Sequence, residues 1–105
     1  MTEVDIAFLP EFGPPMLAGE KTCTSRNSKL GERGDIFSAF GATFEIIAVK
    51  RLGLFYVSHH LFKMEGFNTP TEFIDCWNRI HPHAQFDPLR QVYTHFFKRI
   101  DAHND

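Results

Sequence analysis

Hydrophobic and polar positions in the first third of the chain predict short elements separated by tight bends. Residues 4–10, VDIAFLP, alternate enough to predict a first strand that ends at Pro10. In FGPPMLAG the paired prolines favour a helix start and Gly19 favours its end, so we expect one short helical turn. KTCTSR then predicts a strand leaving the Gly19 turn, and NSKLGERG predicts a polar loop.

The middle of the chain predicts a hairpin followed by a helix. DIFSAF and TFEIIAVKRLGLFYV indicate two strands joined at Gly41-Ala42, and the second is long enough to bend at Gly53. YVSHHLFKMEGF overlaps the end of that strand and has apolar residues at helical spacing. It predicts a helix that stops at Gly66.

The strongest helix pattern is NTPTEFIDCWNRIHP. Thr69 is a suitable N-cap, Pro70 occupies the first helical position, and Glu72 completes a capping box. Apolar residues then recur on one face, at Phe73, Ile74, Trp77 and Ile80. After a loop, QVYTHFFKRI predicts a last strand, and the polar DAHND predicts a frayed tail.

This order of elements predicts the fold class. Strands outnumber helices and mostly follow one another through short loops, which is typical of an antiparallel sheet. We expect an α+β fold, a small and mainly antiparallel β-barrel with two or three helices packed against it. A chain of 105 residues has the size of one domain, so we expect a single domain over residues 1–105, with its core at 6–100 and a frayed tail at 101–105. Several of the 12 phenylalanines should build that core.

Charge and hydropathy narrow the class of protein. The net charge of −2 argues against a protein that coats long nucleic acids. The sequence still allows a local basic patch, because the segment between Lys21 and Arg33 has four cations and one anion. No apolar run approaches the roughly 18 residues of a membrane helix, and the N-terminal segment is acidic where a signal peptide is basic. We therefore expect a soluble cytoplasmic protein.

Cysteine and histidine usage argues against a metal site. Cys23 and Cys76 have no C-x-x-C spacing and are expected to be buried thiols. The six histidines, which include the pairs at 59–60 and at 81 and 83, lack HExxH or a comparable ligand spacing. We expect surface or core histidines, no metal and no cofactor.

The candidate chemistry lies in LAGEKTCTSR. A lysine becomes a base when burial lowers its pKa, and a threonine hydroxyl becomes a nucleophile with a base within reach. Lys21 and Thr24 can meet this requirement only if Lys21 sits in the Gly19 turn, because alternation along a strand would otherwise separate them. The plainer interpretation is a solvated strand edge. The guanidinium of Arg26 can form a bidentate hydrogen bond with a phosphate or a carboxylate.

Three residues further along the chain complete the candidates. Glu65 ends a helical segment, where its charge faces the negative end of the helix dipole; such unfavourable places are sometimes functional, although an exposed surface glutamate is the commoner explanation. Tyr56, beside the expected cleft, is a candidate for stacking on a nucleobase. Trp77 lies on an apolar helix face and is expected in the core.

The segments MLAGEKTCTSR, RGDIF and HLFKMEGFNTPTEF together resemble the ASCH family, the domains named for activating signal cointegrator homology. The family signature G-x-K-x-x-x-x-R is present as Gly19, Lys21 and Arg26, and the likeness extends from about residue 6 to residue 100. It implies a PUA-like β-barrel with a cleft where the signature meets the helical insert. It also implies binding of RNA or a nucleoside, with Gly19, Arg26 and Tyr56 as substrate-binding candidates.

Within that family the chain is similar to the small bacterial N(4)-acetylcytidine amidohydrolases. The resemblance places their catalytic lysine, threonine and glutamate on Lys21, Thr24 and Glu65. It implies that a partly neutral Lys21 assists Thr24 in attacking the amide carbon of an acylated nucleobase, and that Glu65 carries the proton to the leaving amine. A non-catalytic RNA- or nucleotide-binding module and a ribonuclease are the alternatives. The sequence leaves the oligomeric state open.

Overall fold

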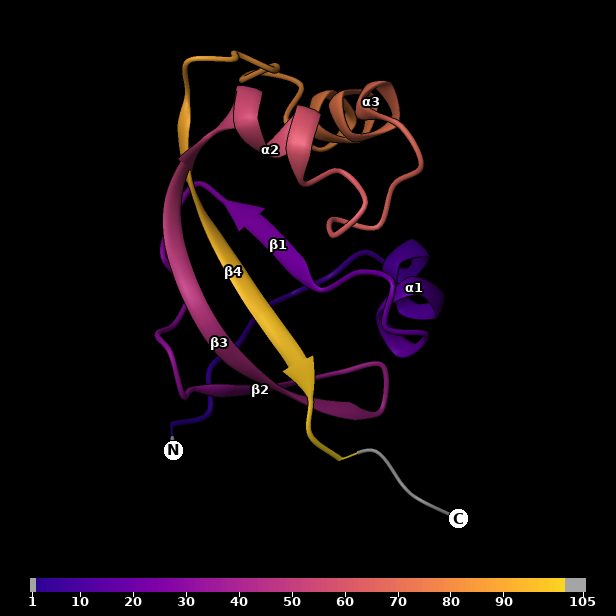
Figure 1. Cartoon of the computed structure of the whole chain (residues 1–105), viewed down its shortest axis with the longest axis vertical. Coiled ribbons are helices and arrows are strands. Elements are labelled where there is room, and N and C mark those ends of the chain that lie inside the picture. Colours follow the sequence, from indigo (N-terminus) through magenta and orange to yellow (C-terminus); the bar gives the residue numbers. More distant parts are fainter. Residues whose placement is uncertain (1, 102–105) are drawn as a thin grey trace.

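A four-stranded antiparallel sheet organises the molecule, in the strand order β1-β4-β3-β2 (Figure 1). The computed structural model describes residues 2–101. The strands are β1 (Cys23–Arg26), β2 (Ile36–Ala39), β3 (Ala42–Gly53) and β4 (Gln91–Arg99). The long β3 and β4 curve together, and the sheet curls into half a barrel. The α+β class and the antiparallel sheet are confirmed, and the described strands close half of a barrel. Of the expected tail, residues 102–105 lie outside the described residues.

The hairpin between β2 and β3 turns through Phe40 and Gly41, one residue earlier than expected. Both have positive φ angles, 53° and 77°, which is the backbone of the tight turn that matches the twist of paired strands. Farther along, the register of β3 against β4 shifts between Ile46 and Ala48. Such a bulge bends a strand, which is consistent with the curl of the sheet.

The expected first strand at residues 4–10 is wrong. The described N-terminal segment has one isolated bridge, between Glu3 and Ile36, and then runs without regular structure to the helical turn η1 (Pro10–Phe12) and helix α1 (Gly13–Leu17). Its alternating apolar residues have another cause. Ile6 and Phe8 pack into the core from an unpaired backbone, so their alternation reflects burial and not sheet pairing.

The helices lie at one end of the sheet and beside its edge strand β1. Helix α2 (Leu54–His60) begins directly after β3, so the extension of that strand through LFYV is wrong. Leu54 and Val57 are buried at helical spacing against the same cluster, which explains why this apolar run coils. Helix α3 (Pro70–Ile80) matches its prediction, with Thr69 accepting the hydrogen bond of an N-cap. Figure 1 shows α2 and α3 together at one end of the sheet and α1 beside β1.

Two hydrophobic clusters form the core. One joins the N-terminal segment and α1 to the β2–β3 end of the sheet, and its buried members are Ile6, Met16, Phe37, Ala42, Phe44, Ile46 and Phe97. The other joins α2 and α3 to the opposite end, and its buried members are Leu54, Val57, Leu61, Phe73, Trp77 and Val92. The buried polar residues of β1 and β4 belong to neither cluster.

Candidate functional site

A pocket of about 300 Å³ lies between β1, α3 and the N-terminal segment. One side is polar and is formed by Lys21, Thr24, Ser25, Arg26 and Glu65. Six further lining residues are largely apolar: Phe12, Phe67, Phe73, Cys76, Trp77 and Ile80. Ala7, Phe8, Leu9 and His81 complete the lining. A concave site with an apolar wall and a few convergent polar groups is the usual form of a small-molecule site.

Lys21 and Glu65 form a buried ion pair at the polar side. Their side chains are 2% and 4% exposed, and Nζ lies 3.4 Å from Oε1. Nζ also donates to the carbonyl oxygens of Glu65, at 2.8 Å, and of Cys23, at 2.9 Å. These three oxygens match the three N–H groups of an ammonium, so each N–H of Lys21 has an acceptor in the folded protein. The ring of Phe12 lies under the ammonium, 4.6 Å from Nζ.

Backbone contacts bring this lysine and this glutamate together from distant parts of the chain. The amides of Thr22 and Cys23 both donate to the carbonyl oxygen of Met64, at 2.7 and 3.1 Å. The turn is tight because Gly66 has a φ of +100°, and a Cβ there would come within 3.2 Å of the Lys21 Cβ. A glycine is therefore required where the glutamate turn meets the lysine.

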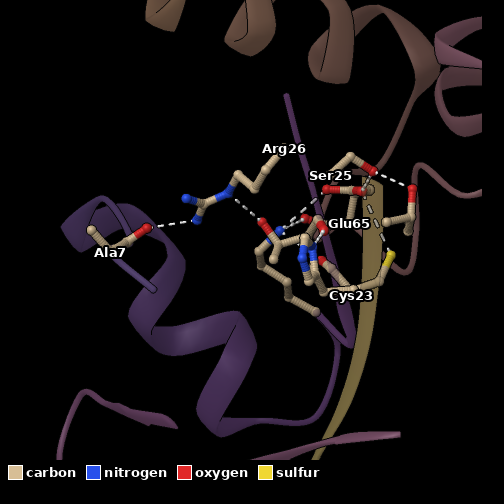
Figure 2. Close-up of polar contacts among 9 residues, drawn as sticks. Ala7, Cys23, Ser25, Arg26 and Glu65 are labelled. Atoms are coloured by element: carbon tan, nitrogen blue, oxygen red, sulfur yellow. Dashed lines mark hydrogen bonds and ion pairs between the residues drawn. The ribbon is translucent and has the colours of Figure 1, made fainter. Parts of the chain in front are cut away.

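The second carboxylate oxygen of Glu65 contacts β1. Ser25 Oγ lies 2.6 Å from Oε2, and the Cys23 thiol lies 3.6 Å from it (Figure 2). Ser25 Oγ is also 2.8 Å from the hydroxyl of Thr94, its register partner on β4. Each oxygen of the carboxylate thus has its own set of donors.

Arg26 points away from this cluster, toward the N-terminal segment (Figure 2). Its Nε donates to Thr24 Oγ1 at 3.0 Å, its Nη2 donates to the Ala7 carbonyl at 2.6 Å, and its guanidinium lies over the Phe8 ring. Burial lowers the pKa of Arg26, while the charge of Glu65 acts in the opposite sense. A guanidinium nevertheless remains charged, so Thr24 has a cationic donor on its oxygen and keeps its own proton free.

His95 supports β1 from the neighbouring strand. The Leu30 amide donates to its Nε2 at 3.0 Å, so the proton of the ring resides on Nδ1, which lies 3.2 Å from the Thr24 carbonyl. Burial lowers the pKa of this fully buried imidazole, and the Thr24 carbonyl opposes the shift. His95 is therefore neutral and structural.

Both cysteines are buried free thiols, as predicted. Burial, and next the negative charge of Glu65, raise the pKa of Cys23 far above its usual range. Burial also raises the pKa of Cys76. Neither cysteine has the depressed pKa of a nucleophilic thiol.

The pocket unites four of the six predicted site residues, Lys21, Thr24, Arg26 and Glu65. Their catalytic or binding roles stay a prediction. Gly19 serves the chain turn, with a φ of +76°, and does not line the pocket. Tyr56 also lies outside it: the ring is 48% exposed on α2 and packs on His60. Trp77 is in the core as expected, and its buried ring also forms pocket wall.

Ser25 and Thr94 are the site residues that the sequence did not reveal. The contact between them depends on the pairing of β1 with β4 across 69 positions of sequence. Among residues 2–101 no group of three or more histidine, cysteine or acidic side chains is placed to hold a metal ion. No helix in the same range is long and apolar enough to cross a membrane.

Solved structures share this fold at low sequence identity. A hypothetical protein, PH0355, superposes with a TM-score of 0.69 and 13% identity, covering 95% of this chain and 100% of that one. The ASCH domain of Lactobacillus crispatus gives 0.63 and 14%, over 93% and 79% of the two chains. An ASCH protein of Zymomonas mobilis gives 0.61 and 13%, over 95% and 76%. No family model and no curated protein matches the sequence. The chain therefore has the fold of the ASCH domains.

Proposed function

We propose that the pocket hydrolyses the N-acyl amide of a cytidine-type nucleoside, either free or within RNA. One observation carries the proposal: a buried ammonium, its paired carboxylate and a threonine hydroxyl line the same pocket as several aromatic rings, which form an aromatic wall. The first three groups can supply proton transfer and a nucleophile, and the wall can receive a planar base.

The Lys21–Glu65 part of the pocket favours a neutral reacting group. The ammonium of Lys21 is compensated by Glu65 at 3.4 Å, so this part of the wall offers no net charge to a phosphate. Phe67, Phe73 and Trp77 offer flat apolar surface instead. A nucleobase amide, which is planar and uncharged, matches both features.

The ion pair can supply both proton-transfer groups for amide cleavage. A proton passing from Lys21 Nζ to Glu65 Oε1 gives a neutral amine and a neutral acid. The amine takes the Thr24 hydroxyl proton as Oγ1 bonds to the acyl carbon, and the acid protonates the base nitrogen as the C–N bond breaks. The Arg26 donor on Oγ1 stabilises negative charge on that oxygen. Water then cleaves the acyl ester, which releases the carboxylic acid and returns a proton to Thr24.

The test incubates the purified protein with a panel of N-acylated nucleosides and with a short single-stranded RNA, followed by mass analysis of the products. We expect free base-amine nucleoside and free acid, with the rate falling at least about 100-fold in Lys21→Met and Thr24→Val. Lys29→Met is the matched control, because this lysine pairs with Glu32 on the surface and does not line the pocket. A Lys21→Met variant as active as the parent would refute the proposal.

Binding of RNA without chemistry is the second candidate, and Arg26 favours it. Its guanidinium lines the pocket and forms no ion pair with a carboxylate among residues 2–101, so a phosphate could pair with it. In that case RNA is retained uncut, and its affinity weakens steeply as salt rises, whereas capture of a neutral nucleoside hardly responds to salt. Cut RNA in the same assay indicates a ribonuclease.

A further inference from the structure

A chain of hydroxyl groups leads from the sheet to the pocket carboxylate. Ser25 Oγ lies 2.6 Å from Glu65 Oε2 and 2.8 Å from Thr94 Oγ1, and Thr94 is fully buried. An ionised carboxylate only accepts hydrogen bonds, so Ser25 donates to Glu65. A serine has one hydroxyl proton, so Thr94 must donate to Ser25. The direction of the chain is therefore defined from Thr94 through Ser25 to Glu65.

The two oxygens of the Glu65 carboxylate have different tasks. Oε1 meets the ammonium of Lys21 at 3.4 Å, and Oε2 meets the Ser25 hydroxyl at the shorter distance of 2.6 Å. The other contact of Oε2 is the Cys23 thiol at 3.6 Å, and a thiol is a weak donor. Without Ser25 the carboxyl group would lose the short bond that fixes its plane.

The fold makes this contact rigid. Ser25 and Thr94 are direct register partners on neighbouring antiparallel strands, so their side chains share one face of the sheet. Glu65 arrives from the turn between α2 and α3, whose backbone is itself bonded to β1. The hydroxyl pair thus connects a regular sheet to a side chain that comes from a loop.

We infer that Ser25 is a positioning residue for the reaction, because its hydroxyl, oriented by Thr94, holds Oε2 so that Oε1 faces Lys21 and can exchange a proton with it. The catalytic part of this inference rests on the proposed function. Ser25 acts through Glu65, and it also favours the charged form of that carboxylate, since a donated hydrogen bond stabilises the anion. Its loss should make Glu65 easier to protonate.

Other titratable and charged groups around Glu65 stay in place when the serine is truncated. They are the Lys21 ammonium, the Cys23 thiol, the Arg26 guanidinium, the His95 imidazole on β4, and the Cys76 thiol that α3 contributes to the same pocket. A change measured in Ser25→Ala therefore reports the missing hydroxyl.

The experiment measures two quantities in the parent, in Ser25→Ala, in Ser25→Thr and in a control. The first is the titration of the Glu65 carboxyl carbon, followed by NMR in isotope-labelled protein without substrate. The second is the pH profile of kcat/KM for amide hydrolysis. Ser38→Ala is the matched control, since Ser38 lies exposed on β2 and outside the pocket. Ser25→Thr keeps a hydroxyl and should restore parental values.

In Ser25→Ala we expect the carboxyl midpoint and the acidic limb of the profile to rise together, while the alkaline limb stays in place. An unchanged midpoint overturns the inference, and so does a raised midpoint with an unchanged acidic limb. Should Ser25→Ala not fold, Ser25→Cys, with its weak donor, must show the same rise or the inference fails. If the parent hydrolyses no amide, the proposed function fails, and the carboxyl titration still decides whether Ser25 controls Glu65.

Discussion

Lys21 and Glu65 are paired charged side chains that are almost fully buried, so each depends on the other to compensate its charge. Removing one partner leaves the other buried and uncompensated, and we expect Lys21→Met to lower the free energy of unfolding by about 3–5 kcal/mol. Urea denaturation measures the change. In the double variant Lys21→Met with Glu65→Gln, the loss should be smaller than the sum of the two single losses. Additive losses would contradict the pairing.

His95 predicts a pH dependence of stability. Burial lowers its pKa in the folded protein, whereas an unfolded histidine titrates near about 6.5. Above that pH both states are neutral; as the pH falls below it, the unfolded chain takes up the proton first. The free energy of unfolding therefore falls toward acid, by at most about 1.4 kcal/mol per pH unit, until the folded protein also binds the proton.

The measurement compares urea midpoints of the parent and of His95→Gln between about pH 7.5 and 5, the range in which histidines titrate. The carboxylates contribute equally to both proteins, so the difference between the two curves isolates the imidazole. We expect the flatter curve in His95→Gln. Two parallel curves would mean that His95 takes up its proton equally in the folded and unfolded states.

Candidate site residues could be named from the sequence where the candidate chemistry belongs to one side chain. Lys21, Thr24 and Glu65 came from a resemblance in short motifs, and they line one pocket. Tyr56 was misplaced because neighbours in sequence, on one short helix, face different directions. The hydrogen-bond partners of Lys21 could not be predicted either, since two of its three acceptors are main-chain carbonyls that only the folded backbone places there.

At the level of elements, the N-cap of α3 is the clearest local stabilising feature. Thr69 Oγ1 accepts the Glu72 amide at 3.1 Å, and Glu72 Oε1 accepts the Asn68 amide at 3.0 Å. We expect Thr69→Ala to lower the free energy of unfolding by about 1 kcal/mol, because an orphan amide loses its partner. Thermal unfolding followed by circular dichroism measures it. Thr71→Ala, an exposed change inside the same helix, should have a smaller effect.

The elements that sequence patterns predicted well carry their own end signals. Helix α3 has a cap, a proline and a capping box, and β4 is a run rich in aromatic and β-branched residues that ends in charged residues. Helix α2 lacks a side-chain cap, so nothing local separates it from β3. The N-terminal segment alternates like a strand but has one bridge to β2, and the choice between strand and coil there depends on a partner that sequence alone does not supply.

For the molecule as a whole, the buried phenylalanines of the first cluster contribute to stability through large rings in mutual contact. Phe37 is fully buried, and its ring lies 5.3 Å from those of both Phe44 and Phe97. Phe37→Ala should cost about 3–5 kcal/mol through lost burial and the cavity left behind. Phe55→Ala is the control, because that ring is 52% exposed on α2. Equal urea midpoints for the two variants would contradict this account of the core.

The composition predicted an aromatic core but not its division into two clusters. Twelve phenylalanines imply large buried rings, yet they do not reveal that the rings gather in two clusters. That division follows from the curl of the sheet, which depends on the bulge in β3 and on pairings between distant strands. The resemblance implied a cleft where the signature strand meets the helical insert, whereas the contacts of Ser25 and Thr94 and the part that the N-terminal segment takes in the lining could not be predicted.

The buried, protonated thiol of Cys23 allows local opening of the protein to be measured by alkylation. Alkylating reagents attack the thiolate, and this sulfur is fully buried beneath the Glu65 turn with its pKa raised by burial. Iodoacetamide should modify the Cys23 thiol only when the turn at Glu65 separates from β1. The labelling rate therefore reports how often this local opening occurs. A ligand that seals the pocket should slow the reaction, which would allow ligands to be ranked without knowledge of any product.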